Sequence, residues 1–348
     1  ANTTGNYNTA VGRDALKLST TGERNTAIGR GSLDANTTGD YNSAVGMNAL
    51  SGNTTADGNT AIGYQALDAN TTGAYNTSVG SGALVANTTS NNNAAVGYQC
   101  LYANTTGTKN TAMGAYALDS NTTGDNNTSL GYEALGGNTT ADGNTAIGFQ
   151  ALLANTTGGN NVAVGAYALD TLTTANDCTA VGGGALGSNT ASMNTAVGSA
   201  CLAANTTGTY NSALGRLAGY VNTTGSNITA MGFEALRSNT TGNDNTAFGF
   251  QVLRTNTTGT QNTGIGCSAL RANTAHNNNA FGLLALNANT TGASNCAFGS
   301  HALQLNTTAA NNSAFGHRAL DANTTGADLT SVGSGSLGAN TTGDRNSA

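Results

Sequence analysis

The chain has 348 residues, of which only 8% are charged, and its formal net charge at pH 7 is −6. An acidic chain with 11 lysines and arginines lacks the basic surface that nucleic-acid binding requires, so we expect no nucleic-acid partner. No apolar run approaches the roughly 18 residues that a membrane span needs, and we expect none in this sequence. Large apolar residues are scarce, which is typical of disorder, but a strict internal repeat argues against disorder.

The sequence consists of copies of one 17-residue repeat, for example Asn53–Ala69 (NTTADGNTAIGYQALDA). We number its positions as slots 1 to 17, which gives the consensus N-T-T-G-x-x-N-T-A-V-G-x-x-A-L-x-x. There are 20 complete repeats, and only those at Asn189 and Asn273 are one residue short, in the turn at slots 4–6. A short fixed period predicts a solenoid with one coil per repeat. The repeats begin at residues 2, 19, 36, 53, 70, 87, 104, 121, 138, 155, 172, 189, 205, 222, 239, 256, 273, 289, 306 and 323.

The residue types favour strands and tight turns over helices. Gly, Asn and Thr are too frequent for a stable helix, and the apolar residues form no 3.6-residue stripe. We expect short strands at Asn59–Ile62 and around Ala66–Leu67, with turns between them. Slot 11 is Gly in all 20 complete repeats, which predicts a corner with positive φ or close backbone approach. The first ten of these glycines are Gly12, Gly29, Gly46, Gly63, Gly80, Gly97, Gly114, Gly131, Gly148 and Gly165.

Two columns of large apolar residues, slots 10 and 15, are the expected core. Slot 9 beside them is restricted to Ala, Ser or one Gly, as expected where backbones of neighbouring chains meet closely around an axis. We therefore expect an all-β parallel β-solenoid of about 20 coils that forms a homotrimer, with a slender monomer as the alternative. The expected core includes Ile62, Leu67, Ile147, Leu152, Phe248, Phe281, Phe298 and Phe315. The expected trimer-axis column includes Ala61, Ala146, Ala163 and Ala180.

The repeat pattern is uninterrupted, so residues 1–348 are expected to form a single continuous array. The sequence opens in slot 17 and stops in slot 9, so we interpret it as a fragment of a longer fibre protein. At about 4.8 Å per coil, 20 coils predict a rod of roughly 95 Å.

The N-T-A-[VI]-G segment of each repeat, as in Asn59–Gly63 and Asn144–Gly148, resembles repeats in the heads of trimeric autotransporter adhesins. The longer segment NTAIGYQALDANTTG at Asn59–Gly73 resembles repeats of phage tail-fibre-type proteins. The resemblance implies a left-handed, trimeric β-roll that serves as an extracellular shaft or adhesive head, on a cell surface or a virion. The implied partners are further copies of the chain and a cell-surface or glycan receptor, contacted through terminal domains outside this sequence.

Candidate chemistry is sparse along the chain. The three histidines, His276, His301 and His317, lie in corner slots without a column of cysteines or carboxylates, so we expect no metal site. Ser is scattered without a His or Asp partner column, so we expect neither an enzyme nor a cofactor. The main alternative to a structural fibre is an ice-binding or other surface-binding solenoid that uses its Thr and Asn columns.

Overall fold

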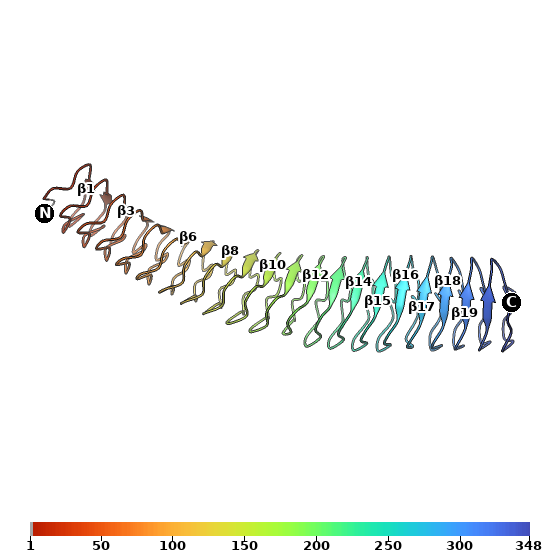
Figure 1. Cartoon of the computed structure of the whole chain (residues 1–348). Helices are drawn as coiled ribbons and strands as arrows, with labels where there is room; N and C mark the ends of the chain where they lie inside the picture. The colour runs from red at the N-terminus through yellow and green to blue at the C-terminus, as the bar shows by residue number, and fades with distance from the viewer. Residues whose placement is uncertain (1–2) are drawn as a thin grey trace. The chain divides into compact units, whose positions relative to one another are not determined.

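The computed structural model describes residues 3–348, which divide into two compact units, residues 3–177 and 178–348. Each unit is built from three-residue strands joined by turns, with no helix among the described residues (Figure 1). Within each unit, successive strands pair in parallel at a spacing of one repeat. The prediction of an all-β parallel β-solenoid with 17-residue coils is therefore confirmed.

The first unit carries ten strands, each formed by slots 8–10 of one repeat. Neighbouring strands pair slot to slot, as in Thr60↔Thr77, Ala61↔Ser78 and Ile62↔Val79. The strands are β1 (Thr9–Val11), β2 (Thr26–Ile28), β3 (Ser43–Val45), β4 (Thr60–Ile62), β5 (Thr77–Val79), β6 (Ala94–Val96), β7 (Thr111–Met113), β8 (Thr128–Leu130), β9 (Thr145–Ile147) and β10 (Val162–Val164).

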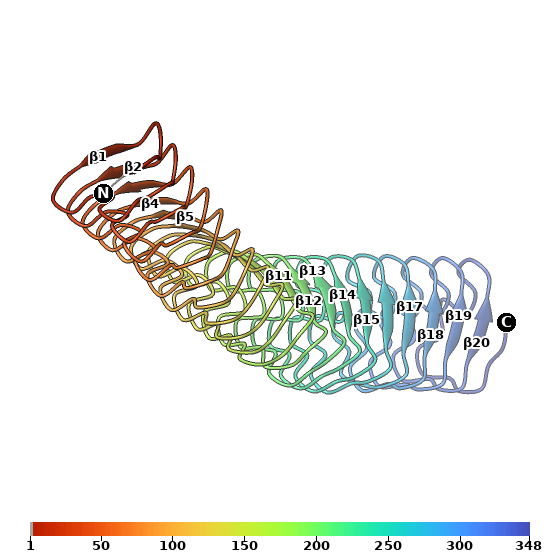
Figure 2. The same ribbon diagram turned by 60° about the vertical axis from the view of Figure 1, so that its left-hand side comes forward.

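The second unit has the same architecture, and Figure 2 shows its strands aligned along one side of the coils. Both 16-residue repeats keep the strand register, since Thr179 pairs with Thr195 and Thr263 with Asn279. The missing residue is therefore absorbed in a turn. The strands are β11 (Thr179–Val181), β12 (Thr195–Val197), β13 (Ser212–Leu214), β14 (Thr229–Met231), β15 (Thr246–Phe248), β16 (Thr263–Ile265), β17 (Asn279–Phe281), β18 (Cys296–Phe298), β19 (Ser313–Phe315) and β20 (Thr330–Val332).

The expected second strand around Ala66–Leu67 is wrong, because this segment is a turn. Leu67 has a φ of 56°, in the left-handed region, which is incompatible with an extended strand. The coils are nevertheless hydrogen-bonded there, since the Leu67 amide donates to the Ala83 carbonyl at 3.0 Å. Burial of the leucine side chain, which contributes about 1.5–3 kcal/mol, offsets the cost of this backbone conformation.

The slot-11 glycines lie at a corner directly after each strand. The ten glycines named above have φ between 129° and 144°, a region that side chains disfavour. Close approach adds a second constraint at Gly148, where a Cβ atom would lie 2.7 Å from the Gly165 carbonyl oxygen of the next coil.

The assignment of slot 10 to the core is wrong, and slot 9 takes its place. Ala61 is fully buried, whereas Ile62 is 42% exposed. Slot 9 faces slot 14 across a narrow interior, as shown by Ser78, whose Oγ donates to the Ala83 carbonyl at 2.8 Å. Only small side chains fit between these backbones. The misassigned slot-10 residues, all exposed or half-buried, are Ile62, Ile147, Phe248, Phe281, Phe298 and Phe315.

The proposed trimer-axis column is wrong for the same reason. Neighbouring residues of a strand point to opposite faces, so a small slot 9 inside the coil places slot 10 outside. Four side chains expected on the axis instead lie in the coil interior with no exposure, namely Ala61, Ala146, Ala163 and Ala180. Leu67 and Leu152 do lie in the interior, fully buried.

Two ladders of buried asparagines complete the interior. In slot 1, Asn121 Nδ2 donates to Asn104 Oδ1 at 2.9 Å and to the Gly124 carbonyl at 3.0 Å. In slot 7, Asn59 Nδ2 donates to the Gly73 carbonyl of the next coil at 2.9 Å. These amides satisfy turn carbonyls that the short strands leave without ladder partners, and buried polar groups require such bonds.

Candidate functional site

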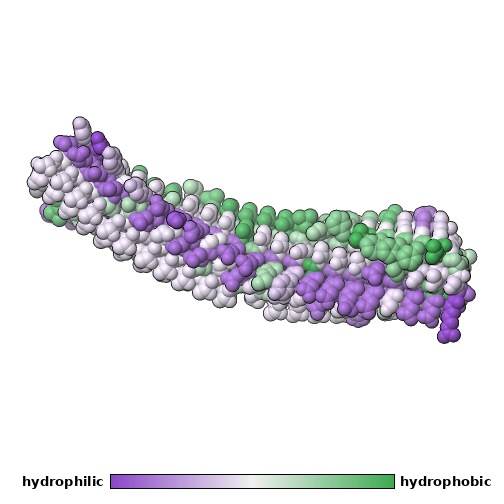
Figure 3. Space-filling view, viewed as in Figure 1, coloured by the Kyte–Doolittle hydropathy of each residue, from purple (hydrophilic) through white to green (hydrophobic). Residues whose placement is uncertain are grey.

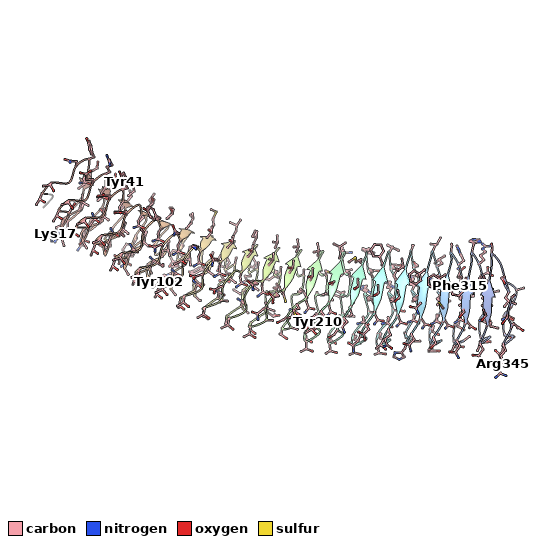
Figure 4. The ribbon with its side chains drawn as sticks, viewed as in Figure 1. Lys17, Tyr41, Tyr102, Tyr210, Phe315 and Arg345 are labelled. Atoms are coloured by element: carbon pink, nitrogen blue, oxygen red, sulfur yellow. The ribbon has the colours of Figure 1, made fainter. Side chains whose placement is uncertain are left out.

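The outward face of the strands is the first candidate surface. Slot 10 is apolar in every strand, and none of these side chains is buried. Phe248 is 54% exposed and Phe315 is 42% exposed. Figure 3 shows hydrophobic side chains gathered over β15–β19, and Figure 4 shows Phe315 on its strand, away from Tyr210 at a corner. A large exposed apolar patch of this kind is typical of an interaction surface.

Three of the four phenylalanines that we placed in the core instead stack on one another outside. The ring centroids of Phe281 and Phe298 are 4.3 Å apart with planes at 9°, and those of Phe298 and Phe315 are 5.3 Å apart at 8°. The exposed slot-10 side chains, one at the end of each strand, form what we call the outward column. A hollow of about 320 Å³ adjoins this column at β13–β15, lined by Leu214, Met231, Gly232, Phe233, Phe248, Gly249 and Phe250.

Slot 8 shares the outward face with slot 10, because the two are separated by one residue. Slot 8 is Thr in 13 of the 20 strands and never charged. The face therefore presents a hydroxyl column beside an apolar column. The slot-2 threonines differ, because their hydroxyls donate within the protein, as Thr54 Oγ1 does to the Thr71 carbonyl at 3.1 Å.

A second candidate surface lies at the corner formed by the side chains of slots 12, 13 and 16. In the first unit, five aromatic rings from consecutive repeats form a continuous aromatic ladder: Tyr98, Tyr116, Tyr132, Phe149 and Tyr167. Their successive centroids are 5.4, 6.0, 5.6 and 5.3 Å apart. The signal in the sequence was the presence of an aromatic residue in slot 12 or 13 of five repeats in succession.

A hollow of about 430 Å³ opens beside this ladder, and we call it the Glu133 hollow. Burial raises the pKa of Asp119, and the charge of Glu133 acts in the same direction. A hydrogen bond with Glu133 raises the pKa of Tyr132. The hollow is lined by Tyr116, Asp119, Ser120, Tyr132, Glu133, Gly136, Gly137 and Leu153.

The cysteines and histidines are the remaining candidate reactive side chains within residues 3–348. Burial raises the pKa of the Cys100 and Cys201 thiols to about 12, so neither is a thiolate near neutral pH. The rings of His301 and His317 are 6.1 Å apart. Within residues 3–348, no group of three or more His, Cys, Asp or Glu side chains is arranged to hold a metal ion. In the same range, no helix is both long and apolar enough to cross a membrane.

No protein-family model matches the chain, and no curated protein matches its sequence.

Proposed function

We propose that this chain is a non-enzymatic, extracellular structural segment of a fibre, a cell-surface shaft or adhesin head or a tail-fibre-like element. The observation that carries the proposal is the uncharged outward face, with its apolar slot-10 column, that every coil repeats. The resemblance of the N-T-A-[VI]-G segments to adhesin and tail-fibre repeats supports the same role.

The coil-to-coil bonding suits a load-bearing shaft. In addition to the strand pairs, the turns of adjacent coils are hydrogen-bonded. For example, the backbone amides of Thr37 and Thr38 both donate to the Thr54 carbonyl, at 2.8 and 3.3 Å. The asparagine ladders add side-chain bonds in the same direction. Pulling neighbouring coils apart would therefore break many parallel bonds at once.

The occupant that fits the outward column best is a second and third copy of this chain. An identical copy brings the same spacing of about 4.8 Å between side chains, so that the columns can interdigitate coil by coil. No charged residue lies in slots 7–11 of any repeat, so no unpaired charge would be buried. In a cyclic trimer each column packs against the other two, which removes the apolar face from water.

The alternative is an ice-binding surface, and the outward Thr column of slot 8 favours it. Against it, the adjacent slot 10 changes from Val and Ile to stacked phenylalanines in the second unit, which makes the face uneven. A thermal-hysteresis assay separates the two functions, because the fibre role predicts no activity at micromolar protein.

Electron microscopy tests the fibre role itself. Purified protein should appear as elongated particles of uniform width. Compact globular particles would contradict the proposal, and thermal hysteresis would replace it with the ice-binding function.

A further inference from the structure

The Glu133 hollow exists because slot 16 of its repeat is glycine. A Cβ atom on Gly136 would lie 3.3 Å from Asp119 Oδ1 and 3.5 Å from Leu153 Cδ1. The hollow is therefore a space between two side chains of neighbouring coils, open where most repeats carry a slot-16 side chain. Its walls combine two carboxylates with two tyrosine rings.

The carboxylates in the hollow have a polar partner but no cationic one. Gln150 Nε2 donates to Glu133 Oε2 at 2.7 Å. In the described part of the chain, none of the ion pairs involves Asp119 or Glu133. Two acids that share a partly desolvated hollow repel each other, so a bound cation would stabilise both.

The second unit contains a related arrangement in which the glutamate has cationic partners, although Tyr220 stands there in the place of Asp119. Glu234 occupies the same slot as Glu133, and Gln251 Nε2 donates to it at 2.8 Å, as Gln150 does to Glu133. Arg254 Nε lies 2.7 Å from Glu234 Oε2, and Arg237 Nε lies 3.5 Å from Glu234 Oε1. Both arginines are in slot 16. The corresponding residues of the first unit are Gly136, for Arg237, and Leu153, for Arg254.

Two of the aromatic residues also correspond, whereas Tyr116 is replaced by Leu217. Phe233 and Phe250 in slot 12 stack with planes at 11°, as do Tyr132 and Phe149. The Arg216 guanidinium lies 5.9 Å from the centroid of the Phe233 ring. An arginine near Tyr132 could make the same type of cation–π contact while it pairs with the carboxylates.

We propose that the Glu133 hollow binds the guanidinium group of an arginine side chain that belongs to a separate peptide or protein ligand. The guanidinium takes the place that Gly136 leaves open, pairs with Glu133 and Asp119 and lies against the tyrosine rings. A neutral sugar would use the rings but would leave the paired carboxylates without a cation. This binding goes beyond the structural role proposed above and does not rest on it.

Calorimetric titration of the full chain with two matched peptides tests the proposal. Acetyl-Gly-Arg-Gly-amide is compared with the same peptide carrying citrulline, which has the same shape but no charge. We expect the arginine peptide to bind at least about tenfold more tightly than the citrulline peptide. Hydrogen bonds between a charged guanidinium and carboxylates are stronger than those that the neutral citrulline can donate. Equal affinity, absence of binding at millimolar peptide, or preference for a neutral oligosaccharide would overturn the proposal.

Two pairs of variants locate the site. Glu133→Gln should weaken binding of the arginine peptide about tenfold, whereas Asp142→Asn, with the same charge change at another corner, should leave it unchanged. Gly136→Arg should supply the cation internally and abolish binding, whereas Ala203→Arg, in the same slot of another repeat, should retain it. Melting curves establish that each variant is folded. If folded Glu133→Gln and Gly136→Arg both bind like the parent protein, the hollow is not the site.

Discussion

The side chain of Val252 fills the space beside Gly264. A Cβ on Gly264 would overlap Cγ1 of Val252, and both residues are buried. Gly264 is the only glycine in slot 9 and Val252 is the only valine in slot 14, in the adjacent coil. The two substitutions therefore compensate in volume across the coil interior, which is packed too tightly to accept either change alone.

A double-mutant cycle tests this compensation. Gly264→Ala should destabilise the protein by about 1–3 kcal/mol through overpacking against Val252. Val252→Ala should destabilise it by leaving a cavity. The double variant restores the Ala–Ala pair that most other coils have, so its loss should be smaller than the sum, with a coupling of about 0.5–3 kcal/mol. Denaturant unfolding measures all four proteins, and additive losses would show that the residues are independent.

Gly148 tests the slot-11 corner. Gly148→Val places a branched side chain at a φ of 135° and against the backbone of Gly165, so it should cost several kcal/mol, roughly the upper range for single substitutions. Asp142→Ala, at an exposed corner of the same repeat, removes only the hydrogen bond that the Asp125 amide donates to its carboxylate and should cost about 0.5–1.5 kcal/mol. Equal melting temperatures for the two variants would show that the glycine column has no conformational role.

Asn121 tests the buried ladder. Asn121→Asp removes the amide that donates to Asn104 and Gly124 and places a carboxylate in the interior, so it should cost more than about 3 kcal/mol. Asn126→Asp makes the same chemical change at an exposed corner of the same repeat and should be close to neutral. Thermal unfolding of the two variants measures the difference in stability. A similar loss of stability in both would contradict an internal asparagine ladder.

The pH dependence of stability tests Glu234. Burial opposes its ionisation, but hydrogen bonds from Arg254 and Gln251 and the charges of Arg254 and Arg237 hold its pKa below the ordinary value of 4.5. Such a group stabilises the fold above its unfolded pKa, and this contribution is lost as the pH falls through its folded pKa. Glu234→Gln should therefore lower the melting temperature at pH 7 and have progressively less effect below pH 4.5. A difference independent of pH would contradict the ion pair.

The repeat predicted the fold because its glycine, asparagine and strand-forming positions recur at a fixed spacing. It did not predict which side of each strand faces inward. Ala61 and Ile62 are both apolar, and hydrophobicity alone favours burying the larger one. The width of the coil decides which of the two side chains faces inward. The slot-9 and slot-14 backbones lie close together and buried asparagines occupy part of the interior, so only the small alanine fits inside.

The binding surfaces were harder to predict for a related reason. The backbone at Leu67 and at the other slot-15 leucines is in the left-handed region, which leucine seldom adopts. Residue propensities therefore do not predict the shape of the corner that carries the aromatic ladder. The Glu133 hollow depends on the absence of a side chain at Gly136. That absence leaves a hollow only because side chains of the two adjacent coils, Asp119 and Leu153, lie on either side of it.

The mass of the assembled protein in solution tests the central proposal most directly. Light scattering coupled to size-exclusion chromatography should give three times the chain mass of 34.3 kDa for the parent protein. The variant Met113→Lys, Leu130→Lys, Ile147→Lys places charges on the outward face of three adjacent strands, where a single chain tolerates them, so it should be folded and have the mass of one chain. A parent protein with the mass of one chain at all concentrations, or a triple-lysine variant with the parent's assembled mass, would contradict association through the outward column.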